Sequence, residues 1–324
     1  MSSNLKKNND DLSEQINCLK KFAQDQAHSI LDDTECYNSL ISIGYIVIYD
    51  QDHDCDIFVQ QRFDQVISNY FNEIFKIRTE IDFHTKLGEN LARTAVDRNE
   101  ILAQTYNFVF AITNRIFIGS VEFCTLFVKN DGLRLFLQFL KDEDFLNKNN
   151  EAKIIDSGDP MVISDDLTLL LTNLVSRTCD EQNDIWKSLN VTEILFKICE
   201  INPTTRLNSY YTLAYLLDDK QIEKLFEQNK MKSILDALLS LLIKASVNFK
   251  ENLFDRMTHE LNFKGKPIKY EVHLVKRDNA NFFFISEVLQ VLYKLSVNDL
   301  IKQAIYFDDN VKDCFKIFFE KGNS

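Results

Sequence analysis

Glycine and proline are both scarce in this sequence, with 7 glycines and 3 prolines among 324 residues. Typical usage is about 7% glycine and about 5% proline, so both are depleted several-fold. Folds such as β-sandwiches and Rossmann domains need many tight turns, and tight turns draw on these two residues. Their scarcity predicts an all-α protein whose helices are joined by polar connections rich in asparagine and aspartate.

Basic residues are also in deficit, because 37 lysines and arginines face 49 aspartates and glutamates, for a net charge of −12. Proteins that bind nucleic acid regardless of sequence need lysine and arginine to neutralise phosphates. Proteins that bind anionic lipid surfaces also need clustered lysine and arginine. We therefore expect neither a nucleic-acid partner nor a membrane partner.

Paired cysteines and long apolar runs are missing as well. The seven cysteines contain no CxxC motif, and Cys124 and Cys199 sit among apolar residues, which indicates buried, reduced thiols in a cytosolic protein. The N-terminus has no apolar signal-peptide core. The most hydrophobic window, residues 40–49, is about half the roughly 20 residues that a membrane span needs. A cytoplasmic location is the expectation.

Helical periodicity divides the chain into three regions. Residues 1–11 are polar and expected to be disordered. From Leu12 onward, apolar residues recur at helical spacing, which predicts an N-terminal helical region over residues 12–97. One helix is expected there from about residue 57 to 77. Residues 98–324 are expected to form a repeat array, on which the N-terminal region stacks.

The array is indicated by a recurring template: apolar, polar, any, apolar, apolar, two variable positions, apolar. Copies begin at Leu133, Val191, Met231 and Val311. About 15 to 17 residues before each start lies the end of another apolar helix, marked by Ile116, Leu174, Leu216 and Leu295. A repeat length near 40 residues is typical of armadillo and HEAT arrays. The prediction is an armadillo/HEAT-like, right-handed superhelical solenoid.

One segment carries a different period. Ile268, Tyr270, Val272 and Leu274 alternate with polar residues, as strand residues do. We predict a β-hairpin inserted near residues 259–275, with an irregular loop as the alternative. Lys264, Lys266 and Lys269 make it locally basic, so it is either a docking site for an acidic surface or simply an exposed, soluble hairpin.

A resemblance to known proteins is carried by several short stretches: residues 129–133, 139–143, 170–174, 184–191, 271–273 and 292–299. They resemble the armadillo-like regions that precede a TIR domain in invertebrate multidomain proteins. The resemblance covers about residues 100–324 and implies a repeat array interrupted by a hairpin-like segment. A TIR domain would bring signalling or NAD-cleaving chemistry, but no run of alternating strands and helices follows residue 280. The resemblance therefore implies a sensing or docking scaffold without that activity.

Motifs that carry catalysis or bind metals are not evident. The sequence has no GxGxxG, P-loop or nucleophile elbow, and its five histidines show no metal-ligand spacing. Aspartates at positions 50, 52, 54 and 56 match the spacing of a calcium loop, but Cys55 and Gln61 replace its glycine and its closing glutamate. We expect a non-enzyme without cofactor or metal, although a dispersed triad is spatial and escapes such a search.

The function predicted is that of a protein–protein interaction scaffold, used in signalling. Its expected contacts are polar positions on the template helices, which in armadillo arrays line the concave face: Arg134, Gln138, Glu193, Lys197, Lys232, Asp236, Lys312 and Lys316. The alternatives are a regulatory domain that binds a nucleotide-like ligand and a helical enzyme of unrecognised type. Self-association is also expected near Ile317 and Phe319, whose side chains exceed what one helical face can bury.

Overall fold

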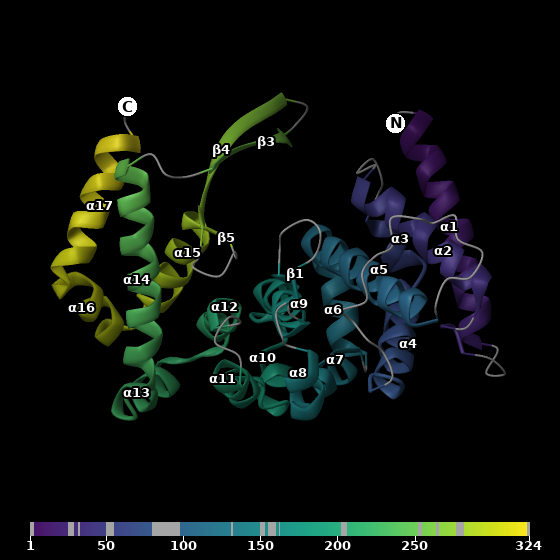
Figure 1. Ribbon diagram of the computed structural model, residues 1–324, viewed down its shortest axis with the longest axis horizontal. Helices are drawn as coiled ribbons and strands as arrows, with labels where there is room; N and C mark the ends of the chain where they lie inside the picture. Colours follow the sequence, from purple (N-terminus) through teal and green to yellow (C-terminus); the bar gives the residue numbers. More distant parts are fainter. Residues whose placement is uncertain are drawn as a thin grey trace. The chain divides into compact units, whose positions relative to one another are not determined.

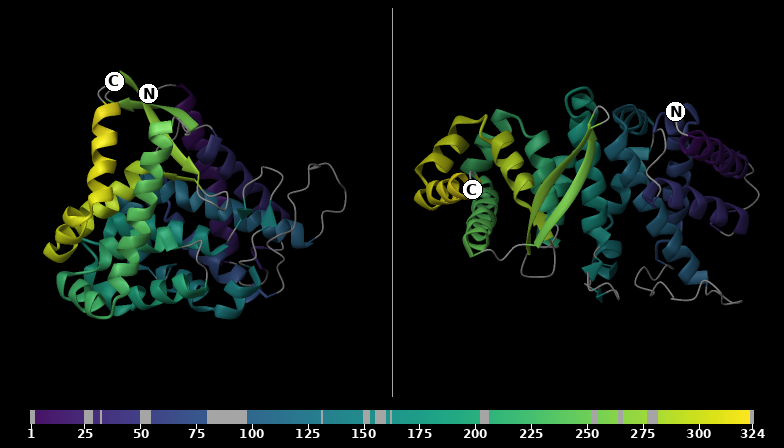
Figure 2. Two further views of the ribbon diagram at one scale, coloured as in Figure 1. Left: turned by 60° about the vertical axis from the view of Figure 1, so that its left-hand side comes forward. Right: turned by 90° about the horizontal axis from the view of Figure 1, so that it is seen from above.

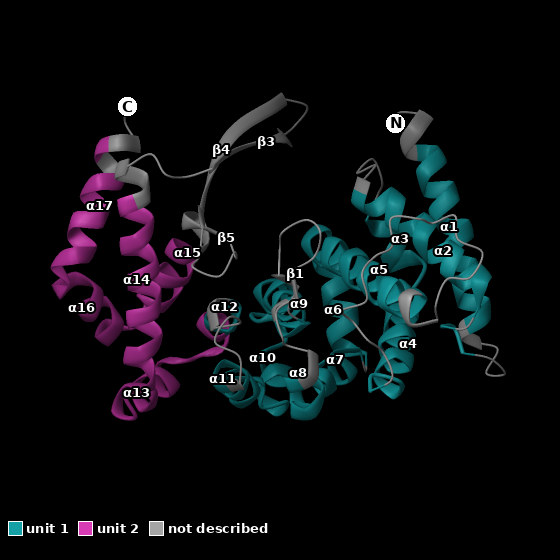
Figure 3. Ribbon diagram, viewed as in Figure 1, with its two compact units in different colours: residues 1–155, 161–212 teal, residues 156–160, 213–324 magenta. Residues whose placement is uncertain are grey.

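The computed structural model describes residues 3–24, 29–31, 33–49, 55–79, 98–130, 132–149, 153–154, 160–161, 163–201, 206–251, 255–263, 266–276 and 282–322. Helices dominate these residues, which confirms the prediction of a mainly helical fold. The chain divides into two compact units, drawn in different colours in Figure 3. Unit 1 comprises residues 1–155 and 161–212, and unit 2 comprises residues 156–160 and 213–324.

Unit 1 begins with helix α1 (Ser3–Gln24). The expectation of disorder over residues 1–11 is therefore wrong for residues 3–11. Leu12, Ile16 and Leu19 form one fully buried stripe of α1, and Asn8, one turn before Leu12, is buried too. The sequence of residues 3–11 gave no sign of this helix, because only one narrow face of α1 packs against the rest of unit 1 and the other positions are polar.

The helices of unit 1 then follow one another in triplets, each with a shorter second helix. The first triplet is α2 (Thr34–Gly44), extended by the π-helix η1 (Tyr45–Tyr49), then α3 (Asp56–Gln60) and α4 (Phe63–Lys76). The second is α5 (Arg98–Gly119), α6 (Val121–Lys129) and α7 (Gly132–Lys141). The third is α9 (Ile163–Thr178), α10 (Asn183–Ser188) and α11 (Val191–Ile201). Between the last two lie α8 (Glu143–Asn149) and a two-stranded sheet of β1 (Lys153–Ile154) and β2 (Pro160–Met161).

Helices of equivalent position pack side by side in unit 1 (Figure 1). The first helices do so in the order α2, α5, α9, the second helices α3 and α6 are in contact, and the third helices follow as α4, α7, α11. Phe71 of α4 meets Phe136 of α7 with ring centroids 5.8 Å apart. Asn173 of α9 donates a hydrogen bond to Asn114 of α5 at 2.7 Å. Each triplet thus buries its apolar face against the next one.

One turn recurs before three of the third helices. Arg62, Asn190 and Asn229 all have positive φ, and each donates its backbone N–H to the carbonyl three residues earlier, at 2.9 to 3.3 Å. Asparagine tolerates this conformation better than most residues. The turn at Arg62 breaks the single helix expected over residues 57–77 into α3 and α4. Because Phe63 opens a further copy of the template, the triplets begin before residue 98, where the sequence pattern placed their start.

Unit 2 contains the rest of the pattern. Its helices are the end of α12 (Arg206–Leu216), then α13 (Asp219–Glu227), α14 (Lys230–Glu251), α15 (Ile285–Leu295), α16 (Asp299–Phe307) and α17 (Asp309–Gly322). Equivalent helices are again joined. Gln290 of α15 donates to the Tyr215 hydroxyl of α12 at 2.8 Å, and Asn298, which caps α16, donates to Asp219 of α13 at 3.0 Å. The third helices α14 and α17 lie side by side (Figures 1 and 2).

Strands occupy the segment between α14 and α15. Strand β3 (Asp255–Phe263) pairs antiparallel with β4 (Lys266–Lys276), and β4 pairs antiparallel with β5 (Phe282–Phe284). This backbone pairing overlaps the hairpin expected near residues 259–275. The side chains of Lys264, Lys266 and Lys269 lie outside the described residues, so their docking role stays a prediction.

Candidate interaction surface

The polar residues predicted to contact a partner are all exposed in the structure. Unit 1 carries Arg134 and Gln138 on α7 with Glu193 and Lys197 on α11, and unit 2 carries Lys232 and Asp236 on α14 with Lys312 and Lys316 on α17. Because α7 packs on α11 and α14 packs on α17, each set of four is brought onto neighbouring helices. We call these two sets the third-helix surfaces.

Local sequence explains why these side chains point to solvent. On α7 the apolar template positions Leu133, Phe136, Leu137 and Leu140 are buried in the core of unit 1. A helix that buries one apolar stripe must turn its remaining positions outward. The exposure of Arg134 and Gln138 is thus a direct consequence of the template.

Two of the exposed lysines are already paired with acids. Lys197 of α11 forms an ion pair with Glu143 of α8, and this hydrogen bond raises the pKa of Lys197. Lys312 of α17 pairs with Asp309 at 2.8 Å, which likewise raises the pKa of Lys312. Exposed pairs of this kind contribute little to stability. A charged side chain of a partner can therefore displace either member of these pairs at small cost.

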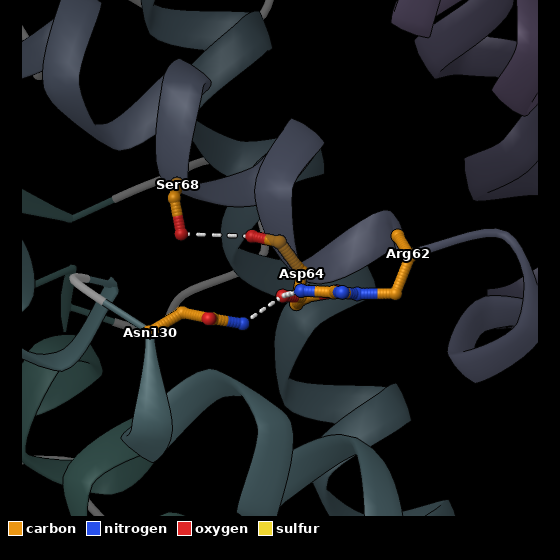
Figure 4. A network of polar contacts seen from close by, with 4 residues as sticks. All are labelled: Arg62, Asp64, Ser68 and Asn130. Carbon is orange, nitrogen blue, oxygen red and sulfur yellow. Dashed lines mark hydrogen bonds and ion pairs between the residues drawn. The ribbon is translucent and has the colours of Figure 1, made fainter.

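A charged network around a buried carboxylate joins α4 to the connection between α6 and α7, and Figure 4 shows it from close by. The Asp64 side chain of α4 is fully buried. Its carboxylate accepts hydrogen bonds from Arg62 Nε at 3.0 Å, from Arg62 Nη2 at 3.1 Å and from the amide of Asn130. Ser68 Oγ donates to the Asp64 carbonyl at 2.8 Å. Asn130 lies just before α7, so the network joins consecutive triplets.

Asp64 occupies the second position of the template, which on α7 is the exposed Arg134. Both of its carboxylate oxygens are engaged, and its bonds to Arg62 raise the pKa of that guanidinium. A buried carboxylate that accepts three hydrogen bonds serves as a structural anchor, because these bonds offset the cost of burying its charge. No sequence pattern indicated this role.

A second anchor joins the end of α4 to the start of α8. The Asp142 carboxylate accepts hydrogen bonds from the Phe145 N–H and from the guanidinium of Arg78. Burial acts to raise the pKa of Asp142, but these bonds outweigh it and hold the pKa below its ordinary value of 3.8.

This pKa shift predicts a dependence of stability on pH. A carboxyl whose folded pKa is depressed stabilises the fold above its unfolded pKa, and the contribution is lost as pH falls through the folded pKa. Replacing Arg78 by glutamine should cost up to about 1 kcal/mol near neutral pH and less below pH 3.8. Urea unfolding of the wild type and of the Arg78→Gln variant, near neutral pH and below pH 3.8, measures this cost. An equal cost at both pH values would contradict the role given to the Arg78–Asp142 pair.

The cysteine thiols are unsuited to nucleophilic chemistry where they are buried. All seven cysteines are free, and Cys36, Cys124, Cys199 and Cys314 are buried, which confirms the predicted burial for these four. Burial raises the pKa of Cys124 to about 12 and also raises the pKa values of Cys36 and Cys314. A thiol reacts as its thiolate. Among the residues that the structure describes, no group of three or more metal-ligating side chains could hold a metal ion.

These pKa values predict which thiols an alkylating reagent reaches in the folded protein. At pH 8, iodoacetamide should modify Cys18, Cys55 and Cys179, which are partly exposed, and leave Cys36, Cys124 and Cys314 unmodified. Peptide mass spectrometry after brief labelling reads out each site. Rapid modification of Cys124 without denaturant would show that α6 is not packed as described.

Ile317 and Phe319 of α17 were expected to form an exposed apolar patch. Ile317 is half-buried on a helix that packs against α14, and the side chain of Phe319 lies outside the described residues. Self-association near these two residues therefore stays a prediction. Large exposed apolar side chains gather instead on α16 and the adjoining end of α15: Tyr293, Val297, Leu300, Tyr306 and Phe307. The signal was present, since six of the nine residues of α16 are apolar, more than one helical face can bury.

The length and apolarity that a membrane span requires are not combined in any single helix among the described residues. Residues 101–119 and α6 together meet both requirements, with a bend of 118° between them. Many of their apolar side chains, such as Val109, Ile112 and Phe123, are buried in the core of unit 1.

The chain matches no known family model, no characterised protein sequence and no solved structure.

Proposed function

We propose that the chain is an armadillo-type helical repeat protein that binds other proteins through its third-helix surfaces and carries out no catalysis. The observation that supports this most is the side-by-side packing of equivalent helices within each unit. An array built this way presents an extended surface of like elements, and repeat proteins use such surfaces to bind partners. The resemblance to armadillo regions of signalling proteins supports the same function.

The chemistry of the surfaces suggests a partner with basic segments. The chain carries a net charge of −12, which favours association with positively charged molecules. On α11 and α8, Glu193 and Glu143 are both exposed beside Lys197. A basic side chain from a partner could take the place of Lys197 on Glu143.

A matched pair of charge-reversal variants tests this proposal. The first, Glu193→Lys with Glu143→Lys, reverses Glu193 of the third-helix surface of unit 1 and the adjoining exposed acid of α8. The second, Glu122→Lys with Asp184→Lys, makes the same charge change at exposed positions on the second helices α6 and α10. Proteins from a cell extract that bind immobilised wild type would be identified, purified and measured by calorimetry against all three.

The third-helix variant should bind at least about tenfold more weakly, which corresponds to about 1.4 kcal/mol. The second-helix variant should bind as wild type does. Equal binding by both variants would exclude the third-helix surface of unit 1 as the interface.

A further inference from the structure

The exposed apolar side chains of unit 2 form a surface of their own. Tyr293 is 74% exposed, Tyr306 67% and Phe307 72%, and Val297 and Leu300 are exposed beside them. These five, which we call the α16 face, account for most of the large exposed apolar side chains among the described residues. Apolar side chains gathered in this way mark interaction sites.

Comparison with the other triplets shows that the α16 face departs from the pattern of the chain. Five residues before the first template residue of each third helix stands an apolar side chain: Phe58, Val128, Trp186, Phe226 and Tyr306. The exposed fraction is 0% for Phe58, 4% for Val128 and 2% for Trp186, against 67% for Tyr306. A position that unit 1 buries each time is thus open to solvent at Tyr306.

The residue that follows this position shows the opposite change, because α16 has an aromatic residue where three other triplets have an exposed charge. In three triplets this position is exposed and charged, as Lys129, Lys187 and Glu227, whereas α16 has Phe307. An exposed aromatic where the other triplets place a charge is unfavourable in water unless something covers it. Tyr306 and Phe307 also contact each other edge to face, with centroids 5.3 Å apart.

Tyr293 stands at a position of α15 that, in other triplets, contacts the first helix of the following triplet. It lies two residues before the end-marking Leu295, as Asn114 does before Ile116 and Thr172 before Leu174. Asn114 bonds to α9 at 2.7 Å and Thr172 bonds to Thr212 of α12 at 2.8 Å, in each case the first helix of the following triplet. The α16 face therefore has the chemistry and orientation of a helix-packing surface.

Charge indicates which molecule covers it. Residues 293–312 contain three lysines and three aspartates, which cancel, in a chain whose net charge is −12. Lys302 pairs with Asp299 at 2.9 Å, and Lys312 pairs with Asp309 at 2.8 Å while its ammonium lies 5.5 Å from the Tyr306 ring centroid. Two such faces can meet without opposing like charges, whereas a strongly charged partner would gain nothing here.

We propose that the α16 face is a self-association surface, on which α16 and the end of α15 of one copy pack against the same elements of a second copy. A two-fold arrangement places the same patch on both sides. Five side chains on each copy bury on the order of 1,000 Å² in total, near the lower end for specific complexes, so the dimer should be weak, with a Kd in the micromolar range. The α16 face adjoins the third-helix surface of unit 2 at Lys312, which lies over the Tyr306 ring. It shares no residue with the third-helix surface of unit 1 and does not depend on the role of that surface.

Sedimentation equilibrium from about 1 to 200 μM, a range that brackets a micromolar Kd, tests the proposal on the full chain. The mass of the wild type should rise with concentration from 37.9 kDa toward twice that value. The variant Tyr306→Ser with Phe307→Lys, which gives α16 the charge seen at Lys129 and Lys187, should raise the Kd at least tenfold. Val121→Lys, at an exposed apolar position of unit 1, should dimerise as wild type does, and circular dichroism checks that all three are folded.

A wild type that stays monomeric over this range would overturn the proposal, as would a variant that dimerises equally well. A photo-reactive phenylalanine analogue at position 306 identifies which molecule covers the α16 face. Cross-linking to a second copy supports the proposal, and cross-linking only to another protein overturns it. Neither result bears on the third-helix surface of unit 1, which is tested by the α8 and α11 variants.

Discussion

Replacing Trp186 by alanine is expected to lower the free energy of unfolding by about 3–5 kcal/mol. Trp186 is the only tryptophan, and its side chain is almost completely buried in unit 1. Its indole N–H donates to the Thr178 hydroxyl at 3.2 Å, which fixes α10 against the end of α9. The alanine variant loses this bond and leaves a large cavity. Urea unfolding followed by far-ultraviolet circular dichroism measures the loss.

Trp186→Phe serves as the matched control. It keeps an aromatic ring and loses the indole N–H, so it should cost only about 1–3 kcal/mol. The Thr178 hydroxyl keeps its hydrogen bond to the Leu174 carbonyl. An alanine variant that costs less than about 1 kcal/mol would show that Trp186 is exposed in solution, as an interface anchor would be.

Replacing Asp64 by alanine should cost about 3 kcal/mol. Removing one member of a buried charge network typically costs about 3–5 kcal/mol, because the remaining polar groups lose their partners. The lower end applies here because the Arg62 side chain is 42% exposed and can turn toward water. The Asn130 amide loses its carboxylate acceptor as well. The same unfolding experiment measures this cost.

A double-mutant cycle with Asn130→Ala separates the contribution of the inter-triplet bond. Since Asp64 and Asn130 are in direct contact, their effects should be non-additive by about 0.5–3 kcal/mol. Additive costs would mean that Asp64 stabilises only its own helix and does not join α4 to the connection before α7.

The sequence predicted those features that a local pattern determines. Helical spacing predicted that both units are mainly helical, and the template located four of the third helices, at Leu133, Val191, Met231 and Val311. The exposure of residues such as Arg134 and Lys232 followed from the same pattern, because a buried stripe leaves the opposite face to solvent. These features need no knowledge of which helix packs on which.

Features that depend on distant contacts escaped the sequence. The break at Arg62 is marked by neither glycine nor proline, and Asp64 looks like any solvated acid until Asn130 is placed beside it. The exposure of Tyr306 likewise depends on what packs over α16, since Tyr306 and buried Trp186 stand at the same position relative to the template. The right-handed superhelix, the role of the hairpin lysines and the cytoplasmic location stay predictions.

Stacked triplets, each packed mainly on its neighbours, are the basis of both the fold and the proposed function. Hydrogen–deuterium exchange of Trp186→Ala beside wild type tests this architecture, because in a repeat array stability is a sum of local and nearest-neighbour terms. Protection should fall most in α9–α11, less in α5–α7, and stay unchanged in α15–α17. An equal fall in every helix, α15–α17 included, would show a single cooperative core and contradict the stacked-triplet architecture.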